Sequence, residues 1–62
     1  MGAVKHLTTD ELAERLGISR RTIEGWRRTG EGPKFLPLVK GIRYREADVE
    51  AWEKSRLVTP GT

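Results

Sequence analysis

Apolar residues recur at helical spacing near the start of the chain, and residues that favour a helix start precede them. The segment LTTDELAERL places apolar side chains at i, i+1 and i+4, which is the spacing of one helix face. Thr8 can cap this helix, Glu11 can complete a capping box, and Leu7 with Leu12 can form a hydrophobic staple. The pattern therefore predicts a helix from about Thr9 to Leu16.

The same pattern repeats after a very short connection. Gly17 suits the left-handed residue that ends a helix, and Ser19 can cap the next one. Ile18 and Ile23 provide a second staple, so we predict a second helix over about 20–28. Because the connection has only three residues and begins with glycine, it is typical of a helix-turn-helix.

A short apolar run follows, and after a turn the alternation of Ile42, Arg43 and Tyr44 predicts a returning strand. With Lys40-Gly41 as the turn, Val39 pairs with Ile42 in a β-hairpin. Proline cannot donate to a sheet ladder, so we expect the strand of Pro37 to lie at an edge. One face of the hairpin then carries Phe35, Pro37, Val39, Ile42 and Tyr44, and the other carries Leu36, Leu38, Arg43 and Arg45.

The segment READVEAWEKSRL predicts a third helix over about 46–56, with Val49 and Trp52 facing inward. Its acidic residues cluster in the first half and its basic residues lie near the end, as the helix dipole favours. Together the elements predict a mostly α fold with a small β-hairpin: a winged helix-turn-helix with the order helix, helix, strand, strand, helix. We expect one domain over residues 1–62, with its core over about 6–57 and a disordered tail at 58–62. The aromatic residues Trp26, Phe35, Tyr44 and Trp52 are expected in the core rather than stacked on bases.

Composition excludes several classes of site. The 62 residues contain no cysteine and one histidine, so disulfides, thiolate metal sites and imidazole clusters are excluded. We therefore expect no metal and no cofactor. The sequence contains no apolar run long enough to span a bilayer, and we expect no secretory leader. It is expected to be cytoplasmic, in a bacterial host cell, with no membrane partner.

Charge is distributed unevenly along the chain. Residues 19–45 contain eight lysines and arginines against Glu24 and Glu31, a net charge of +6, whereas the two flanks together hold −3. A basic segment between acidic flanks is the distribution expected of a nucleic-acid binder.

The predicted second helix has the composition of a helix that lies in a DNA groove. At 100° per residue, Ile23 and Trp26 mark its buried face and the arginines lie away from it. A major groove admits one α-helix, whose N-terminal residues contact base edges, and arginine can bond guanine. The candidate groove-facing residues on this helix are Ser19, Arg20, Arg21, Thr22, Glu24, Gly25, Arg27 and Arg28. A basic face that only contacts water remains the alternative.

The predicted hairpin supplies a second candidate contact. Lys40, Gly41 and Arg43 lie at its turn or on its returning strand, where they can reach a phosphate or the adjacent narrower groove. The alternative is a hairpin that merely covers the core.

Two segments, LTTDELAERLGISRRTIEGWRRTG and VKGIRYREADVEAW, resemble the excisionase-like, MerR-type winged helix-turn-helix family over about residues 6–56. The resemblance implies one helix in the major groove, a wing in the minor groove, and groove-facing positions for Arg20, Arg21 and Thr22. Full-length MerR-type regulators continue into a long dimerising helix and an effector domain, whereas this sequence ends shortly after the third helix. It is therefore more similar to a phage or mobile-element excisionase. Such a recombination directionality factor binds and bends attachment-site DNA and directs a site-specific integrase toward excision.

Several functions remain open. The expected partners are double-stranded DNA, the integrase, and neighbouring copies of the chain arranged head to tail. In that arrangement the acidic third helix of one copy faces the basic wing of the next. A small transcriptional regulator of the same fold is the first alternative, and an adaptor whose basic face meets an acidic protein is the second. We expect no enzyme, because the sequence contains no nucleophile-base pair, metal cluster or phosphate-binding glycine loop.

Overall fold

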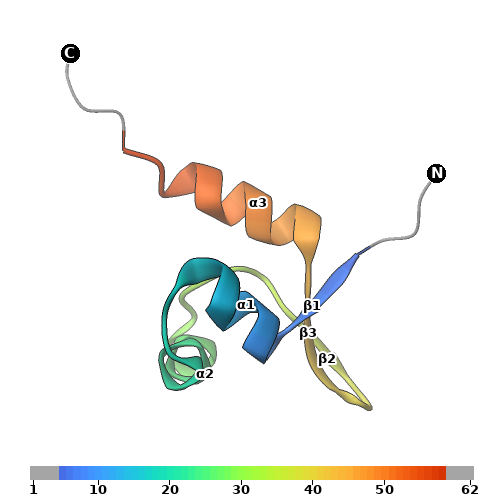
Figure 1. The fold of residues 1–62 in the computed structure, drawn as a ribbon. Coiled ribbons are helices and arrows are strands. Elements are labelled where there is room, and N and C mark those ends of the chain that lie inside the picture. Colours follow the sequence, from blue (N-terminus) through green and yellow to red (C-terminus); the bar gives the residue numbers. More distant parts are fainter. Residues whose placement is uncertain (1–4, 59–62) are drawn as a thin grey trace.

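A computed structural model describes residues 5–58, which form a small mixed α/β arrangement of three helices and a three-stranded antiparallel sheet (Figure 1). In chain order the elements are β1 (His6–Thr8), α1 (Thr9–Leu16), α2 (Arg20–Thr29), β2 (Leu36–Leu38), β3 (Gly41–Arg45) and α3 (Glu46–Ser55). The predicted tail lies, apart from its first residue, outside the described residues.

The helix ends follow the predicted capping residues. Thr8 Oγ1 accepts from the backbone N–H of Glu11 at 3.1 Å, and Glu11 Oε1 accepts from the N–H of Thr8 at 2.8 Å, so the capping box is formed. Gly17 ends α1 in the left-handed region at φ 70°, where a side chain would be strained. Ser19 caps α2 by accepting from the N–H of Thr22 at 3.2 Å. These contacts confirm the short helix-turn-helix connection.

The predicted element order is wrong at its start, because β1 precedes α1. The sheet has the order β1-β3-β2, and β1 pairs antiparallel with β3 through His6↔Arg45, Leu7↔Tyr44 and Thr8↔Arg43. Three residues are too few to show a strand alternation. Two of them, Leu7 and Thr8, are also the staple and cap residues of the following helix, so the sequence pattern was explained without a strand. The prediction that Pro37 lies on an edge strand is confirmed.

The predicted hairpin turn is also wrong, by one residue. Leu38 pairs with Gly41 and Pro37 pairs with Ile42, so the turn is Val39-Lys40 rather than Lys40-Gly41. This shifts the register by two residues, and a shift of two leaves each side chain on its predicted face. Val39 leaves the predicted strand for the turn, where its side chain is fully exposed, and Gly41 leaves the predicted turn for β3.

The core lies between α1, α2, α3 and one face of the sheet. Its buried apolar residues are Leu7, Leu12, Ala13, Ile23, Tyr44 and Val49. The prediction that the aromatic residues lie in the core is fully confirmed only for Tyr44. Trp26 and Trp52 are half-buried, with ring centroids 5.3 Å apart, and Phe35 is 38% exposed. Gly32 closes over Trp26 so tightly that a Cβ there would lie 2.6 Å from the indole ring.

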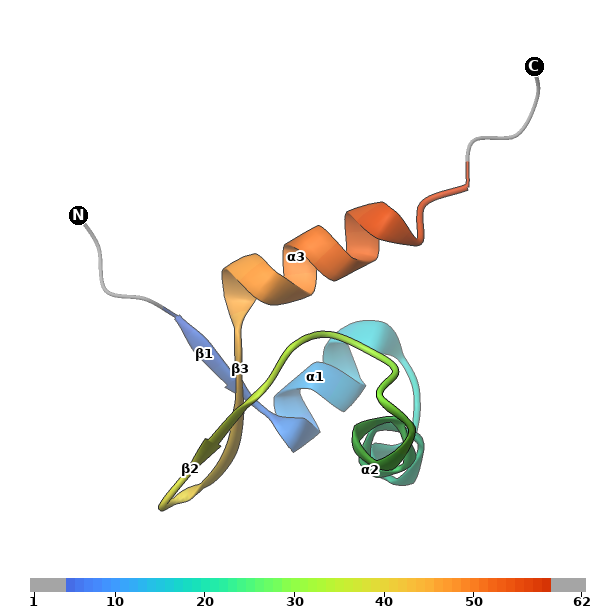
Figure 2. The same ribbon diagram turned by 180° about the vertical axis from the view of Figure 1, so that it is seen from behind.

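The third helix is attached to α1 by charged side chains. Arg15 donates to both carboxylate oxygens of Glu53, at 2.9 and 2.7 Å, and lies 3.6 Å from Glu46. Figures 1 and 2 show α3 on one side of the molecule and the β2–β3 turn projecting on the opposite side. None of the helices within residues 5–58 has the length and apolar character needed to cross a membrane.

Candidate nucleic-acid interface

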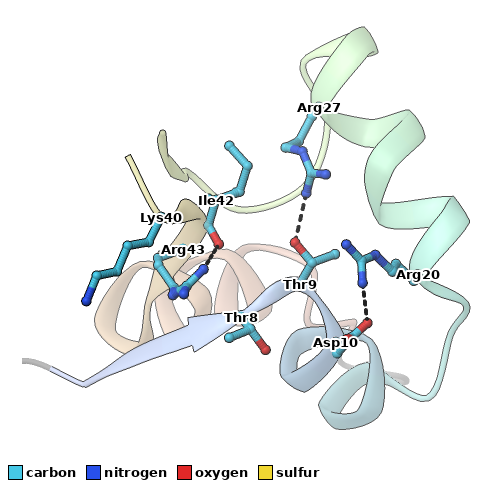
Figure 3. A pocket seen from close by; sticks show the side chains of 9 residues that line it. Thr8, Thr9, Asp10, Arg20, Arg27, Lys40, Ile42 and Arg43 are labelled. Carbon is cyan, nitrogen blue, oxygen red and sulfur yellow. Dashed lines mark hydrogen bonds and ion pairs between the residues drawn. The ribbon is translucent and has the colours of Figure 1, made fainter. Parts of the chain in front are cut away.

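An open cleft lies between α2, the β2–β3 hairpin and the start of α1 (Figure 3). Each of these elements contributes polar or charged side chains to it. The lining residues are Thr8, Thr9, Asp10, Arg20, Arg27, Lys40, Gly41, Ile42 and Arg43. Five of the residues predicted to contact DNA, from two separate segments of the sequence, therefore meet in one place.

Arg27 is held in the cleft by two hydroxyl groups. Its Nη1 donates to the Tyr44 hydroxyl at 2.9 Å and to Thr9 Oγ1 at 3.2 Å. The side chain is half-buried, which differs from the expectation that all four arginines of this helix leave the core. Tyr44 is almost completely buried, and a buried hydroxyl requires a hydrogen-bond partner. The guanidinium of Arg27 is consequently fixed in position.

Arg20 is held by two carboxylates. Its Nε donates to Glu24 Oε2 at 3.0 Å, and its Nη1 donates to Asp10 Oδ1 at 3.0 Å. The hydrogen bond to Glu24 and the charge of Asp10 raise the pKa of Arg20. Because Asp10 belongs to α1, this network ties the N-terminus of α2 to the preceding helix and reduces the positive charge at one side of the cleft.

The other cations of the cleft have no such partners. Arg43 Nη1 donates to the carbonyl oxygen of Ile42 at 2.9 Å, and Figure 3 shows Lys40 extending from the hairpin. Within residues 5–58, Arg27, Lys40 and Arg43 take part in none of the ion pairs. The cleft therefore offers three cations without carboxylate partners, a charge arrangement that favours an anion.

The remaining predicted residues lie outside the cleft. Ser19 Oγ and Thr22 Oγ1 are 3.0 Å apart at the start of α2. Arg21 and Arg28 are exposed. A Cβ added at Gly25 would meet nothing within 4 Å, so the space beside this helix position is open.

The sequence from residue 7 to residue 56 matches a family model described as a helix-turn-helix domain. The chain belongs to this family. Helix-turn-helix domains bind DNA, and this family is common in excisionase-like proteins. A comparison with curated proteins found no match.

Sequence reasoning missed three residues that shape the cleft of this helix-turn-helix domain. Thr9 and Asp10 were explained entirely by the helix start, and Tyr44 was assigned to the core without a role for its hydroxyl. A buried tyrosine hydroxyl needs a hydrogen-bond partner, and the arginines of the basic α2 are candidate donors. The carboxylate of Asp10 gave no comparable indication, because its contact with Arg20 depends on the angle between the two helices.

Proposed function

We propose that this helix-turn-helix domain binds double-stranded DNA with α2 in the major groove and the β2–β3 hairpin as a wing. The observation that carries the proposal is the cleft between the two elements, where Arg27, Lys40 and Arg43 lie without carboxylate partners. Phosphate groups are the anions that such unpaired cations favour, and phosphate contacts fix the register of a protein on the duplex.

The proposed contacts divide by chemistry. At the start of α2, Arg20 and Arg21 are suited to guanine edges, and the hydroxyl groups of Ser19 and Thr22 are suited to phosphates or bases. Along the outer face of α2, Arg28 is suited to phosphates and Glu24 to cytosine. Gly25 leaves room for the groove floor, since the space around it is open.

The finer proposal is an architectural role in recombination. The resemblance to excisionases, together with a family common in excisionase-like proteins, supports a protein that bends attachment-site DNA and directs a site-specific integrase toward excision. A single small module makes a limited interface, so several copies would bind side by side, head to tail. This role places the protein in the cytoplasm of a bacterial host. The alternative, a transcriptional regulator that binds one operator, uses the same contacts.

A gel-shift titration tests DNA binding and separates these roles. The probe is attachment-site DNA from the protein's own replicon, in circularly permuted fragments, at two salt concentrations. Stepwise complexes whose mobility depends on the position of the site support the bending, multi-copy role. One complex without a bend supports the regulator. Absence of binding at low salt contradicts the proposed DNA binding and favours the alternative of an adaptor whose basic face binds an acidic protein.

Two matched variants test whether the cleft carries the binding. Lys40→Gln removes a cleft cation, whereas Lys54→Gln removes a cation from the exposed end of α3. The first variant should bind more weakly and lower the slope of log K against log salt by about 0.9, the value for one phosphate contact. The second should behave as the wild type. Equal losses in both variants contradict a role for the cleft.

A further inference from the structure

The end of the β2–β3 hairpin carries two exposed apolar side chains, Leu38 at the end of β2 and Val39 in the turn. The relative exposure of Val39 is 106% and that of Leu38 is 47%. We call these two residues the apolar tip. Within residues 5–58, Val39 is the most exposed of the large hydrophobic side chains. The tip projects on the side opposite α3 (Figures 1 and 2).

Local structure does not explain a valine at this position. Two-residue hairpin turns favour asparagine, aspartate and glycine, and β-branched residues are suited to a pleated, packed surface rather than a turn. Val39 contacts none of the core and is surrounded by solvent. A residue that conflicts with its local structure without a gain in packing indicates a function outside the folded chain.

We propose that the apolar tip enters the minor groove of duplex DNA and wedges against a base step, so that the duplex bends. This inference rests on the proposed DNA binding and identifies Leu38 and Val39 as the residues that bend the DNA. Proteins that bind the minor groove insert apolar side chains between base steps, which partly unstacks the bases and kinks the duplex away from the protein.

The shape of the hairpin end suits a narrow groove. Leu38 pairs with Gly41, which has no side chain, so the strands beside the turn carry only one side chain at that position of the ladder. The minor groove is only about 6 Å wide. A hairpin end with large side chains on both strands would be a poorer fit than this one.

Charge near the tip favours DNA over a protein partner. Lys40 follows Val39 directly, and with Arg43 it lines the cleft beside α2, so the tip continues the proposed DNA interface. Cations beside an apolar tip are suited to the phosphates that border a groove. Two apolar side chains are far short of the roughly 800 Å² per partner that a stable protein interface buries.

The test compares bending by the wild type and Val39→Ala. The wild-type protein first selects duplexes of about 30 base pairs from a random pool, and fluorescence energy transfer between dyes at the two ends then reports the bend. Val39→Ala removes two methyl groups and no charge. We expect roughly tenfold weaker binding, a smaller bend at saturation, and an unchanged salt dependence. Val39→Ile keeps a β-branched apolar side chain at the tip and should bend the duplex as much as the wild type does.

Two controls make the result specific. Leu57→Ala shortens another exposed apolar side chain, 76% exposed and located beyond α3, and should leave binding and bending unchanged. Lys40→Gln should lower the salt slope by about 0.9 and leave the bend at saturation unchanged.

The outcomes distinguish this inference from the proposed function. A Val39→Ala protein that binds and bends like the wild type overturns the wedge and leaves DNA binding intact, as would occur if the tip served a protein partner. An equal loss in Leu57→Ala also overturns it, because the effect would then not belong to the tip. Failure of the wild type to select any duplex overturns both proposals.

Discussion

At the scale of single residues, Asp10 opposes the function proposed for its surroundings. It lines a cleft rich in cations, and its carboxylate lies 3.0 Å from Arg20. A DNA phosphate entering the cleft would be repelled by Asp10 and would compete with it for Arg20. We therefore predict that Asp10→Asn binds duplex DNA of arbitrary sequence about two- to fivefold more tightly at low salt, and that the gain diminishes as salt is added. Fluorescence anisotropy measured over a salt series checks this.

Glu14→Gln is the matched control for that prediction. It removes one negative charge from the exposed surface of the same helix but from outside the cleft. An equal gain in both variants would assign the effect to net charge. Unchanged or weaker binding by Asp10→Asn would contradict competition between Asp10 and phosphate. Thermal unfolding of both variants accompanies the titration, because an acid in the first turn also stabilises the helix.

At the scale of elements, the pair Arg15–Glu53 joins α1 to α3 and makes their packing depend on pH. The hydrogen bonds donated by Arg15 lower the pKa of Glu53. A lowered pKa in the folded state adds stability above the unfolded pKa, near 4.3, and this stability is lost as the pH falls through the folded pKa. Because both side chains are about one-third exposed, 29% and 34%, solvent screens the pair and its contribution is under about 1 kcal/mol.

Glu53→Gln should therefore lower the free energy of unfolding at pH 7 by up to about 1 kcal/mol and flatten its decline between pH 5 and 3. Urea unfolding at several pH values measures both effects. Glu50→Gln, an exposed acid on the same helix without an ion pair among the described residues, should keep the wild-type decline. Identical profiles for the wild type and Glu53→Gln would show that the pair does not stabilise the helix contact.

The elements also show which parts of this fold are predictable from sequence. The helices are predictable because caps such as Thr8 and Ser19 act within one turn of the chain, and the structure has the predicted contacts. The position of the hairpin turn is less predictable, because neither Val39-Lys40 nor Lys40-Gly41 is a favoured two-residue turn sequence. The alternation of apolar and polar residues permits either register. Strand β1 is not predictable, since its three residues become a strand only by pairing with β3, more than thirty residues later.

The candidate site, too, is predictable only where its features are local in the sequence. The pattern of α2 identifies its arginines, but it cannot show that Arg27 is bound by Tyr44 and Thr9 while Arg20 is bound by carboxylates. Those differences depend on how separate elements pack. They matter for function, since they determine which cations are available to DNA.

At the scale of the whole molecule, ion pairs divide the charged residues into two groups. Within residues 5–58, the ion-paired cations are Lys5, Arg15, Arg20 and Arg45. Five unpaired cations lie on α2 and the wing, namely Arg21, Arg27, Arg28, Lys40 and Arg43, and the other unpaired ones are Lys34, Lys54 and Arg56. On α3 the proposed head-to-tail contact loses one of its acids, because Glu53 is bound to Arg15. Glu50 is exposed and absent from these pairs, so it is the acid of α3 best placed to meet the wing of a neighbouring copy.

This difference between two acids gives a test of cooperative assembly. A head-to-tail contact joins unlike surfaces and can propagate along DNA. Glu50→Lys should therefore lower the affinity of the second and later copies on a long duplex, by about two- to fivefold for one exposed pair, while leaving affinity for a one-site duplex nearly unchanged. Glu14→Lys makes the same charge change on α1 and should keep cooperativity. Gel-shift titrations on duplexes of increasing length measure the ratio of successive steps. An unchanged ratio in Glu50→Lys would contradict contact between α3 and the wing, because the reversed charge would then face no cation of a neighbour.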